Sequence, residues 1–242
     1  MRLYIVRHGQ STNNRLSATT GSEVGRSEDP ELTEIGILQA QAVATMLAGG
    51  SADRAALAFN NYDIAGFGIT HLYCSLMVRA VHTASIIGAE LGLRPVPWED
   101  VHEVGGIYLD MPNGLKVGQA GKNRSYFERH FPTVLLPPDL SEEGWYRSKP
   151  FESHDAVPVR AERWFRDLMA RHGESADHVA VVSHGAFLAH FIRLVSKMPS
   201  FVDHPFWFEA ANCSVTRIDF ESHMINVRYV NRFDFLQAHL VT

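Results

Sequence analysis

The sequence predicts an α/β fold: a three-layer sandwich with a mainly parallel central sheet, helices on both faces and an inserted cap. Short apolar runs typical of buried strands alternate with segments of helical periodicity, which is the pattern of parallel βαβ units. Two of these runs, at 3–6 and 179–183, are followed at once by Arg7-His8-Gly9 and by His184-Gly185. A Gly- and Pro-rich stretch at about 104–153 interrupts the alternation. We therefore expect residues 1–242 to form a single domain with a cap insertion at about 104–153.

The N-terminal half begins with a strand at 3–6, and a polar loop follows over 7–31. Thr33 is a typical helix N-cap, and the spacing of apolar residues after it predicts a helix over 34–48. The segments that follow are an ambiguous stretch at 51–68 with a short helix around 53–59, a strand at 69–74, a helix at 78–91 and a short strand at 96–98.

The cap segment lacks clean periodicity and predicts one short helix near 123–130. The alternation then resumes with a helix at 157–172, a strand at 178–183 and a helix at 185–197. Near the C-terminus, alternating apolar and polar residues at 214–219 and 225–229 predict a hairpin that turns near 221–223. This hairpin either pairs with a second subunit or packs on its own sheet, so a homo-oligomer stays open.

Composition excludes several classes of protein. No apolar run approaches the ~20 residues that a membrane span needs, and no secretory pattern is seen at the N-terminus. Cys74 and Cys213 are too few for a disulfide framework, so we expect a cytoplasmic location. A net charge of −5 argues against a nucleic-acid partner, but it does not exclude a small anionic substrate.

Side chains suited to phosphate chemistry follow four of the predicted strands. They are Arg7 and His8 after the first strand, Arg79 after the second, Glu103 after the third and His184 after the fourth. Ligands of parallel sheets bind beyond the carboxyl ends of the strands, so we expect these side chains to meet in one site. An arginine in the first turn of a helix opposes the helix dipole, and an anion beside Arg79 would explain its place.

Five stretches of the chain resemble signatures of the histidine phosphatase superfamily, the phosphoglycerate mutase-like proteins, and occur in family order. They are LYIVRHGQSTNN at 3–14, CSLMVRAVHTA at 74–84, His102-Glu103 before Gly105-Gly106, Val182-Ser183-His184-Gly185, and a weaker late motif, NCSVT at 212–216. Together they span almost the whole chain.

The resemblance implies a metal-independent phosphomonoester hydrolase that acts through a phosphohistidine intermediate. His8 would be the nucleophile, which requires a neutral imidazole whose tautomer is set by a backbone carbonyl. Arg7 and Arg79 would clamp the phosphoryl oxygens, and His184 would stabilise their charge in the transition state. Glu103 would protonate the leaving oxygen and then activate water, although a solvated acidic loop is the alternative reading of that residue.

Two further residues belong to the implied substrate site. Asn14 matches the family's phosphate-contacting asparagine, and Gly185 belongs to the second histidine motif. The acid phosphatase branch has an Asp at the position of Gly185, so the acid must come from elsewhere, which favours Glu103. We expect no metal and no cofactor, because the arginines supply positive charge and no metal-ligand spacing is visible.

The mutases of the family typically carry Glu and Trp where this chain has Gln10 and Asn13. These differences favour a phosphatase that acts on a small phosphorylated metabolite. A cofactor-dependent phosphoglycerate mutase is the alternative, and a non-catalytic phosphate-binding or scaffold protein is a further one.

The cap allows two readings of each of its notable groups. Its cations either grip a second anionic group or form a solvated face; they are Lys116, Lys122, Arg124 and Arg129. Its aromatic residues form either an apolar wall for the substrate or a small core of the cap; they are Tyr126, Phe127, Trp145 and Tyr146.

Overall fold

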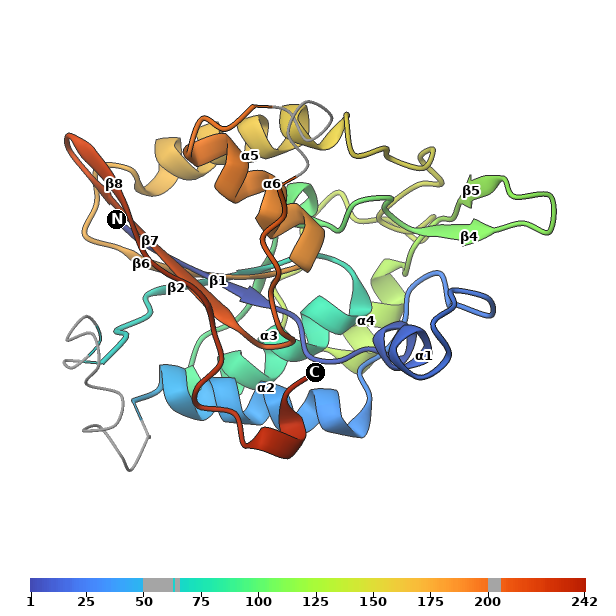
Figure 1. Cartoon of the computed structure of the whole chain (residues 1–242), viewed down its shortest axis with the longest axis horizontal. Coiled ribbons are helices and arrows are strands. Elements are labelled where there is room, and N and C mark those ends of the chain that lie inside the picture. The colour runs from blue at the N-terminus through green and yellow to red at the C-terminus, as the bar shows by residue number, and fades with distance from the viewer. Residues whose placement is uncertain (50–62, 64–65, 200–205) are drawn as a thin grey trace.

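In the computed structural model, which describes residues 1–49, 63, 66–199 and 206–242, six strands form the central sheet. Four of them run parallel: β1 (Arg2–Arg7), β2 (His71–Cys74), β3 (Val96–Pro97) and β6 (His178–Ser183). The other two are β7 (Val215–Glu221), antiparallel to β1, and β8 (Met224–Arg232), antiparallel to β7. The order across the sheet is β3-β2-β6-β1-β7-β8 (Figure 1).

Helices cover both faces of this sheet, as the sequence predicts (Figure 1). On one face, α2 (Glu34–Leu47) and α3 (Val78–Leu91) share a buried core with Tyr4 and Val6 of β1. On the other face, α5 (Val157–His172) and α6 (Gly185–Val195) share a core with Leu3 and Ile5. The three-layer α/β prediction is therefore confirmed, and the alternation of side chains along β1 supplies both cores.

The helix boundaries follow local signals in the sequence. The Thr33 hydroxyl accepts a hydrogen bond from the backbone N–H of Gly36 at 3.0 Å, which confirms Thr33 as the N-cap of α2. Gly92 ends α3 with a φ of 67°, a conformation that glycine adopts without strain. The C-terminal hairpin also forms, with β7 paired to β1, so it packs on its own sheet.

The cap segment contains a two-stranded hairpin, β4 (Tyr108–Asp110) and β5 (Lys116–Gly118), and α4 (Arg124–His130). The helix was predicted, and the hairpin was not. Phe127, Trp145 and Tyr146 are at most 3% exposed and belong to the larger buried cluster, against which the partly buried Tyr126 packs. These aromatic residues thus form part of a core, as one of the two readings expected, but it is the core that α2 and α3 share with β1 and not a separate small core of the cap.

One helix lies where the sequence predicts a loop. α1 (Thr12–Thr20) occupies part of the 7–31 segment, with Ser11 as its N-cap and Asn14 completing a capping box. No residue of α1 is buried, so no apolar periodicity marks it, and its capping signal is its only one in the sequence. The short helix predicted around 53–59 lies outside the described residues. None of the described helices is long and apolar enough to span a membrane.

Candidate active site

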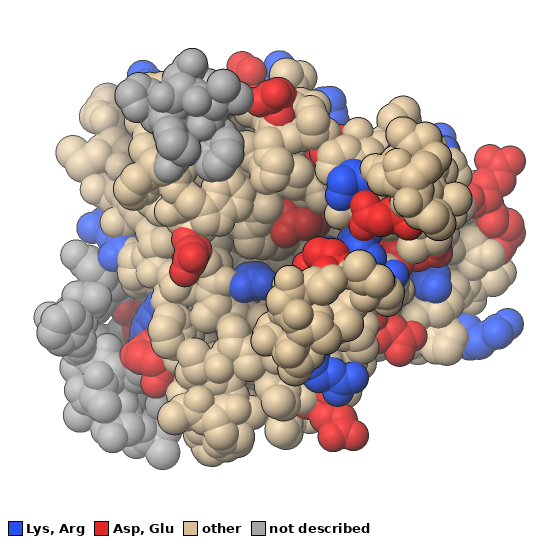
Figure 2. Space-filling view, turned by 45° about the vertical axis from the view of Figure 1, so that its right-hand side comes forward, with Lys and Arg blue, Asp and Glu red and all other residues tan. Residues whose placement is uncertain are grey.

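A cavity of about 770 Å³ opens at the carboxyl end of β1. Its walls come from α1, the 21–31 loop, the start of α3, the cap and the last residues of the chain. Figure 2 shows basic and acidic side chains gathered around a hollow on this side of the molecule. Five of the predicted site residues line the cavity: Arg7, His8, Asn14, Arg79 and Glu103.

The other two predicted residues lie directly behind this wall. His184 is 0% exposed, and its ring centroid is 5.0 Å from that of His8. Gly185 lies against Arg7, since a Cβ there would stand 3.5 Å from the Arg7 Nε. It lines an adjoining cavity of about 520 Å³, to which Arg7 and Glu103 also contribute. The structure thus brings all seven residues into one region.

The imidazole of His8 is held in one tautomer. Its Nδ1 lies 2.7 Å from the carbonyl oxygen of Gly9, which can only accept, so we assign the proton to Nδ1. Its Nε2 accepts a hydrogen bond from the Nε of Arg79 at 3.1 Å. Burial and the charges of Arg79 and Arg7 hold the pKa of His8 well below its ordinary value. His8 is therefore a neutral base with its lone pair on Nε2.

Arg79 is anchored by an acid that the sequence did not single out. Asp29 is buried, its Oδ1 lies 4.0 Å from the Arg79 Nη1, and it accepts a hydrogen bond from the backbone N–H of Val78 at 3.0 Å. Burial raises the pKa of Asp29 to about 6, against the effect of Arg79. Asp29 thus provides an anion beside Arg79, as the position of that arginine in its helix suggested.

Several buried nitrogens of the site lack partners. Among the described residues, neither ring nitrogen of His184 has a hydrogen-bond partner, and the same holds for Nε of Arg7. The Arg7 Nη1 donates to the carbonyl of Ala210, which fixes the guanidinium in place. Burial, Arg79 and His8 keep the pKa of His184 well below its ordinary value. Such groups cost free energy when empty, so this geometry is suited to an acceptor-rich ligand.

The side-chain oxygen of Asn14 accepts three hydrogen bonds, and these bonds orient the amide group. The Asn14 Oδ1 accepts from the Ser11 backbone at 3.1 Å, from the Ser11 hydroxyl at 3.0 Å and from the Asn212 Nδ2 at 3.3 Å. Asn212 also donates to the His8 carbonyl at 3.0 Å, which ties the C-terminal segment to the histidine. With its oxygen occupied, Asn14 offers its NH₂ group to a ligand in the cavity.

Glu103 sits at the N-terminus of α6. Its Oε1 accepts from the backbone N–H groups of Val104 at 2.9 Å and Phe187 at 3.0 Å, and its Oε2 accepts from Ala186 at 3.3 Å. These bonds fix the carboxyl group on the cavity wall that also holds Arg7. The solvated-loop reading therefore does not describe this glutamate.

A comparison with models of known protein families shows the family of this chain. The model of the histidine phosphatase superfamily (branch 1) matches residues 3–232. The chain belongs to the histidine phosphatase superfamily. A curated relative, the 2,3-bisphosphoglycerate-dependent phosphoglycerate mutase of Beijerinckia indica subsp. indica, is 41% identical over 95 residues. That match covers 39% of this chain and 36% of the mutase.

Solved structures of phosphatases share the superfamily fold with this chain. A mycobacterial glucosyl-3-phosphoglycerate phosphatase, complexed with VO3, is 23% identical, with a TM-score of 0.59 over 95% of this chain and 98% of its own. A phosphoserine phosphatase of Entamoeba histolytica, in complex with phosphoserine, is 20% identical, with a TM-score of 0.59 over 98% and 99% of the two chains. At these identities the likeness concerns the fold.

Sequence reasoning missed three residues of this superfamily site. Asp29 and Arg26 come from the 21–31 loop, which has no periodicity. Only the contacts of the folded chain bring Arg26 to the cavity and Asp29 to the side of Arg79. Asn212 opens the weak late motif, so a signal existed, but its role depends on the packing of residues about two hundred positions apart.

One group of described residues has the composition of a metal site, and it lies elsewhere. His71, His172 and Asp177 stand at the amino ends of β2 and β6, opposite the cavity. His172 already uses both ring nitrogens, in contacts with Asp177 at 2.8 Å and the Tyr73 hydroxyl at 3.0 Å. This histidine is satisfied by protein partners.

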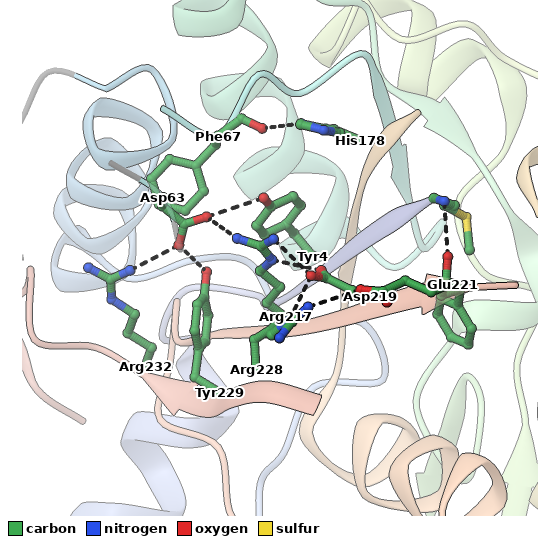
Figure 3. Close-up of polar contacts among 12 residues, drawn as sticks. Tyr4, Asp63, Phe67, His178, Arg217, Asp219, Glu221, Arg228, Tyr229 and Arg232 are labelled. Carbon is green, nitrogen blue, oxygen red and sulfur yellow. Dashed lines mark hydrogen bonds and ion pairs between the residues drawn. The ribbon is translucent and has the colours of Figure 1, made fainter. Parts of the chain in front are cut away.

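A second buried polar cluster, which we call the Asp63 cluster, covers β1, β7 and β8 away from the cavity (Figure 3). Asp63 accepts hydrogen bonds from Arg217 at 2.7 Å, Tyr229 at 3.0 Å and Tyr4 at 3.2 Å. Arg217 also makes a two-pronged contact with Asp219, at 2.8 and 2.9 Å. The remaining members are Arg228, 2.8 Å from Asp219, and Arg232, 3.3 Å from Asp63.

Proposed function

We propose that this protein is a metal-independent phosphomonoester hydrolase that acts on a small phosphorylated metabolite through a phosphohistidine at Nε2 of His8. The observation that carries the proposal is the tautomer of His8. The Gly9 carbonyl holds the proton on Nδ1, and the Nε of Arg79 donates a hydrogen bond to Nε2, so the lone pair is on Nε2. Both side chains line the cavity. A nucleophile that attacks phosphorus needs this state, and the depressed pKa of His8 maintains it across the physiological range.

The site residues can complete a balanced two-step cycle. In the first step the Nε2–P bond forms and the ester P–O bond breaks, while Glu103 gives a proton to the leaving oxygen. In the second step water attacks phosphorus, the N–P bond breaks, and Glu103 takes a proton from the water. Arg7, Arg79, Asn14 and His184 stabilise the charge on the phosphoryl oxygens in both steps. Inorganic phosphate and an alcohol are the products.

Hydrolysis is favoured over mutase chemistry by the residues around His8. A mutase must keep water from the phosphohistidine, whereas this cavity is lined mostly by polar side chains. The residues Gln10 and Asn13, both on its wall, also depart from the mutase pattern.

Two buried free thiols, Cys74 and Cys213, support a reducing compartment such as the cytoplasm.

The test is phosphate release from an aryl phosphate in EDTA between pH 5 and 8. We expect wild-type turnover to survive the chelator and to fall by at least about 10³-fold in His8→Ala. Rapid quenching should trap a phosphorylated chain that is stable in base and labile in acid. Turnover that persists in His8→Ala would sink the phosphohistidine mechanism. Isomerisation of a phosphoglycerate without phosphate release would favour the mutase instead.

The role of Glu103 has its own test, based on the leaving group. In Glu103→Gln we expect an alkyl phosphate to lose about 10²- to 10⁴-fold in kcat/KM, because its leaving oxygen needs a proton. An aryl phosphate leaves without that help and should lose far less. Equal losses on both esters would show that Glu103 supports the fold of the site and is not its acid.

A further inference from the structure

Polar and charged side chains supply much of the cavity wall beyond the phosphoryl site. The residues there are Asn13, Ser17, Ala18, Glu23, Arg26 and Tyr108. The cap residues Phe127, Trp145 and Tyr146 are buried and do not line the cavity. A substrate that fills this space therefore meets polar groups together with the apolar surface of Ala18 and Tyr108.

Arg26 is held rigidly in this outer wall. Its Nη1 donates to the carbonyl of Tyr108 at 2.8 Å, and its guanidinium lies 3.9 Å above the Tyr108 ring. The loop that carries it is fastened to α1, because Asn13 exchanges two hydrogen bonds with the backbone of Ser27, at 2.8 and 2.9 Å. Arg26 thus bridges the loop and the cap with little freedom to move.

The charge of Arg26 is only weakly neutralised. Its Nε is buried and has no hydrogen-bond partner among the described residues. Its ion-pair partner is Glu23, at 3.8 Å, and that carboxylate is 60% exposed. Arg26 and Arg79 line the same cavity. Burial lowers the pKa of Arg79, and the charge of Arg26 acts in the same direction. A phosphoryl group held by Arg7 and Arg79 would not neutralise the charge of Arg26.

The cations that the sequence proposed for a second anion are occupied elsewhere. Lys116 pairs with Asp110 at 3.1 Å, and Arg124 donates to the carbonyls of Leu140 at 2.8 Å and Pro137 at 2.6 Å. Lys122 and Arg129, like these two, do not line the cavity. Among the described residues, the arginines on its wall are Arg7 and Arg79, which belong to the phosphoryl site, and Arg26, which comes from the 21–31 loop.

We infer that Arg26 determines specificity by binding a second anionic group of the substrate, a carboxylate or a second phosphate. The inference rests on the proposed function and names the substrate class: small, polar phosphate esters with a further negative charge. Glu23 competes with that group for Arg26, so it weakens binding of the doubly anionic ester.

A matched pair of esters tests this inference. Glycerol 3-phosphate and 3-phosphoglycerate share a three-carbon skeleton with a hydroxyl at C2 and differ in the carboxylate, and glycerol 1,3-bisphosphate carries a second phosphate in its place. We expect wild type to prefer one of the doubly anionic esters by about 10- to 100-fold in kcat/KM. The ratio should fall toward one in Arg26→Gln and rise in Glu23→Gln. Which ester shows the change identifies the anion.

The same comparison is made by binding, as thermal shifts of each ester on the His8→Ala background with and without Arg26→Gln. If wild type hydrolyses none of the esters but this binding preference appears and depends on Arg26, the proposed function fails and the inference stands. If turnover is normal and the ratio is unchanged in Arg26→Gln, Arg26 only supports the cap through Tyr108, and the inference is wrong. A wild type with no preference in either assay also overturns it.

Discussion

The active site and the Asp63 cluster are two buried polar clusters among the described residues, and they differ in how far their charges are neutralised within the chain. In the Asp63 cluster each carboxylate has two arginines against it, and the tyrosine hydroxyls point into the same contacts (Figure 3). In the active site, Arg7 and Arg79 lie with two histidines, and the carboxylate nearest to Arg79 is Asp29, at 4.0 Å. The described residues leave His184 and the Nε of Arg7 without hydrogen bonds. Both clusters lie against β1, one toward its start and one at its carboxyl end.

This difference in charge neutralisation suggests that the Asp63 cluster stabilises the fold and that the active site binds a ligand. A buried charge that is matched within the chain resists loss of either partner, because the survivor would be left uncompensated. A buried donor without a partner costs stability in the empty protein and is repaid when a ligand supplies an acceptor. We therefore expect substitutions in the Asp63 cluster to act on folding and substitutions in the site to act on turnover.

The largest expected effect on folding comes from Arg217→Met. The methionine keeps the apolar stem but removes the arginine that Asp63 and Asp219 share, so that each buried carboxylate keeps one arginine, Arg232 or Arg228. Because two buried ion pairs are broken at once, we expect a loss of about 3–5 kcal/mol in the free energy of unfolding. Urea unfolding at pH 7.5 measures it. The folded fraction should hydrolyse an aryl phosphate at the wild-type rate.

The control is the exposed pair of Lys149 and Glu99. Lys149→Met should change the free energy of unfolding by less than about 1 kcal/mol, because solvent screens that pair. An equally small loss in Arg217→Met would show that matched burial does not stabilise this fold, and the contrast between the clusters would fail on its stability side.

His184→Leu should produce the opposite result. Removing a donor that faces developing charge costs about 10²- to 10³-fold in kcat, or about 2.7–4 kcal/mol of activation free energy. The leucine also removes two buried nitrogens that lack partners, so the free energy of unfolding should stay the same or rise. Steady-state kinetics and urea unfolding on one preparation measure both. A variant that loses stability and keeps its activity would show that His184 is a structural core residue.

The sequence predicts well the parts of this molecule that depend on periodicity and strand order. The apolar spacing locates α3 at 78–91 and α5 at 157–172 with their observed bounds, because these helices bury one face. The convergence of Arg7, Arg79 and His184 follows from one rule, since each lies at or shortly beyond the carboxyl end of a parallel strand.

What the sequence misses depends on contacts between segments that carry no periodic signal. α1 buries no residue, so its pattern is indistinguishable from a polar loop. Asp29 matters because it reaches the first turn of α3, and no spacing in the sequence encodes that contact. The cap cations were sound candidates by charge alone, but none of the four lines the cavity that Arg26 lines. Lys116 pairs with Asp110, and Arg124 donates to carbonyls of the cap.

Inorganic phosphate sharpens the comparison through linkage. It offers acceptors to Arg7, Arg79 and His184, so at 100 times its Kd it should stabilise the folded state by about 2.7 kcal/mol. We expect the thermal shift to disappear in Arg79→Leu and to remain in Arg217→Met at its lower melting temperature. A shift that survives in Arg79→Leu would place phosphate outside the predicted clamp.

The smallest expected effect is on the pH dependence of the free energy of unfolding, to which the two clusters contribute in different pH ranges. His8 and His184 have depressed pKa values in the folded state, so below the ordinary value of about 6.5 the unfolded chain binds protons that the folded chain does not. Stability should therefore fall as the pH falls below about 6.5, by up to about 1.4 kcal/mol per pH unit for each histidine. His184→Leu should make the fall shallower, as urea midpoints from pH 7.5 to 5 would show.

The Asp63 cluster predicts a different pH range. Burial opposes ionisation of Asp219, but hydrogen bonds from Arg217 and Arg228 keep its pKa below the ordinary value, so its contribution is present above about pH 4 and is lost only in stronger acid. Asp29, whose pKa of about 6 gives a slope of the opposite sign between about pH 4 and 6, is common to wild type and His184→Leu and cancels in their difference. An unchanged slope in His184→Leu would mean that this histidine takes up a proton in the empty folded site as readily as in the unfolded chain, so burial and the neighbouring cations would not hold it neutral.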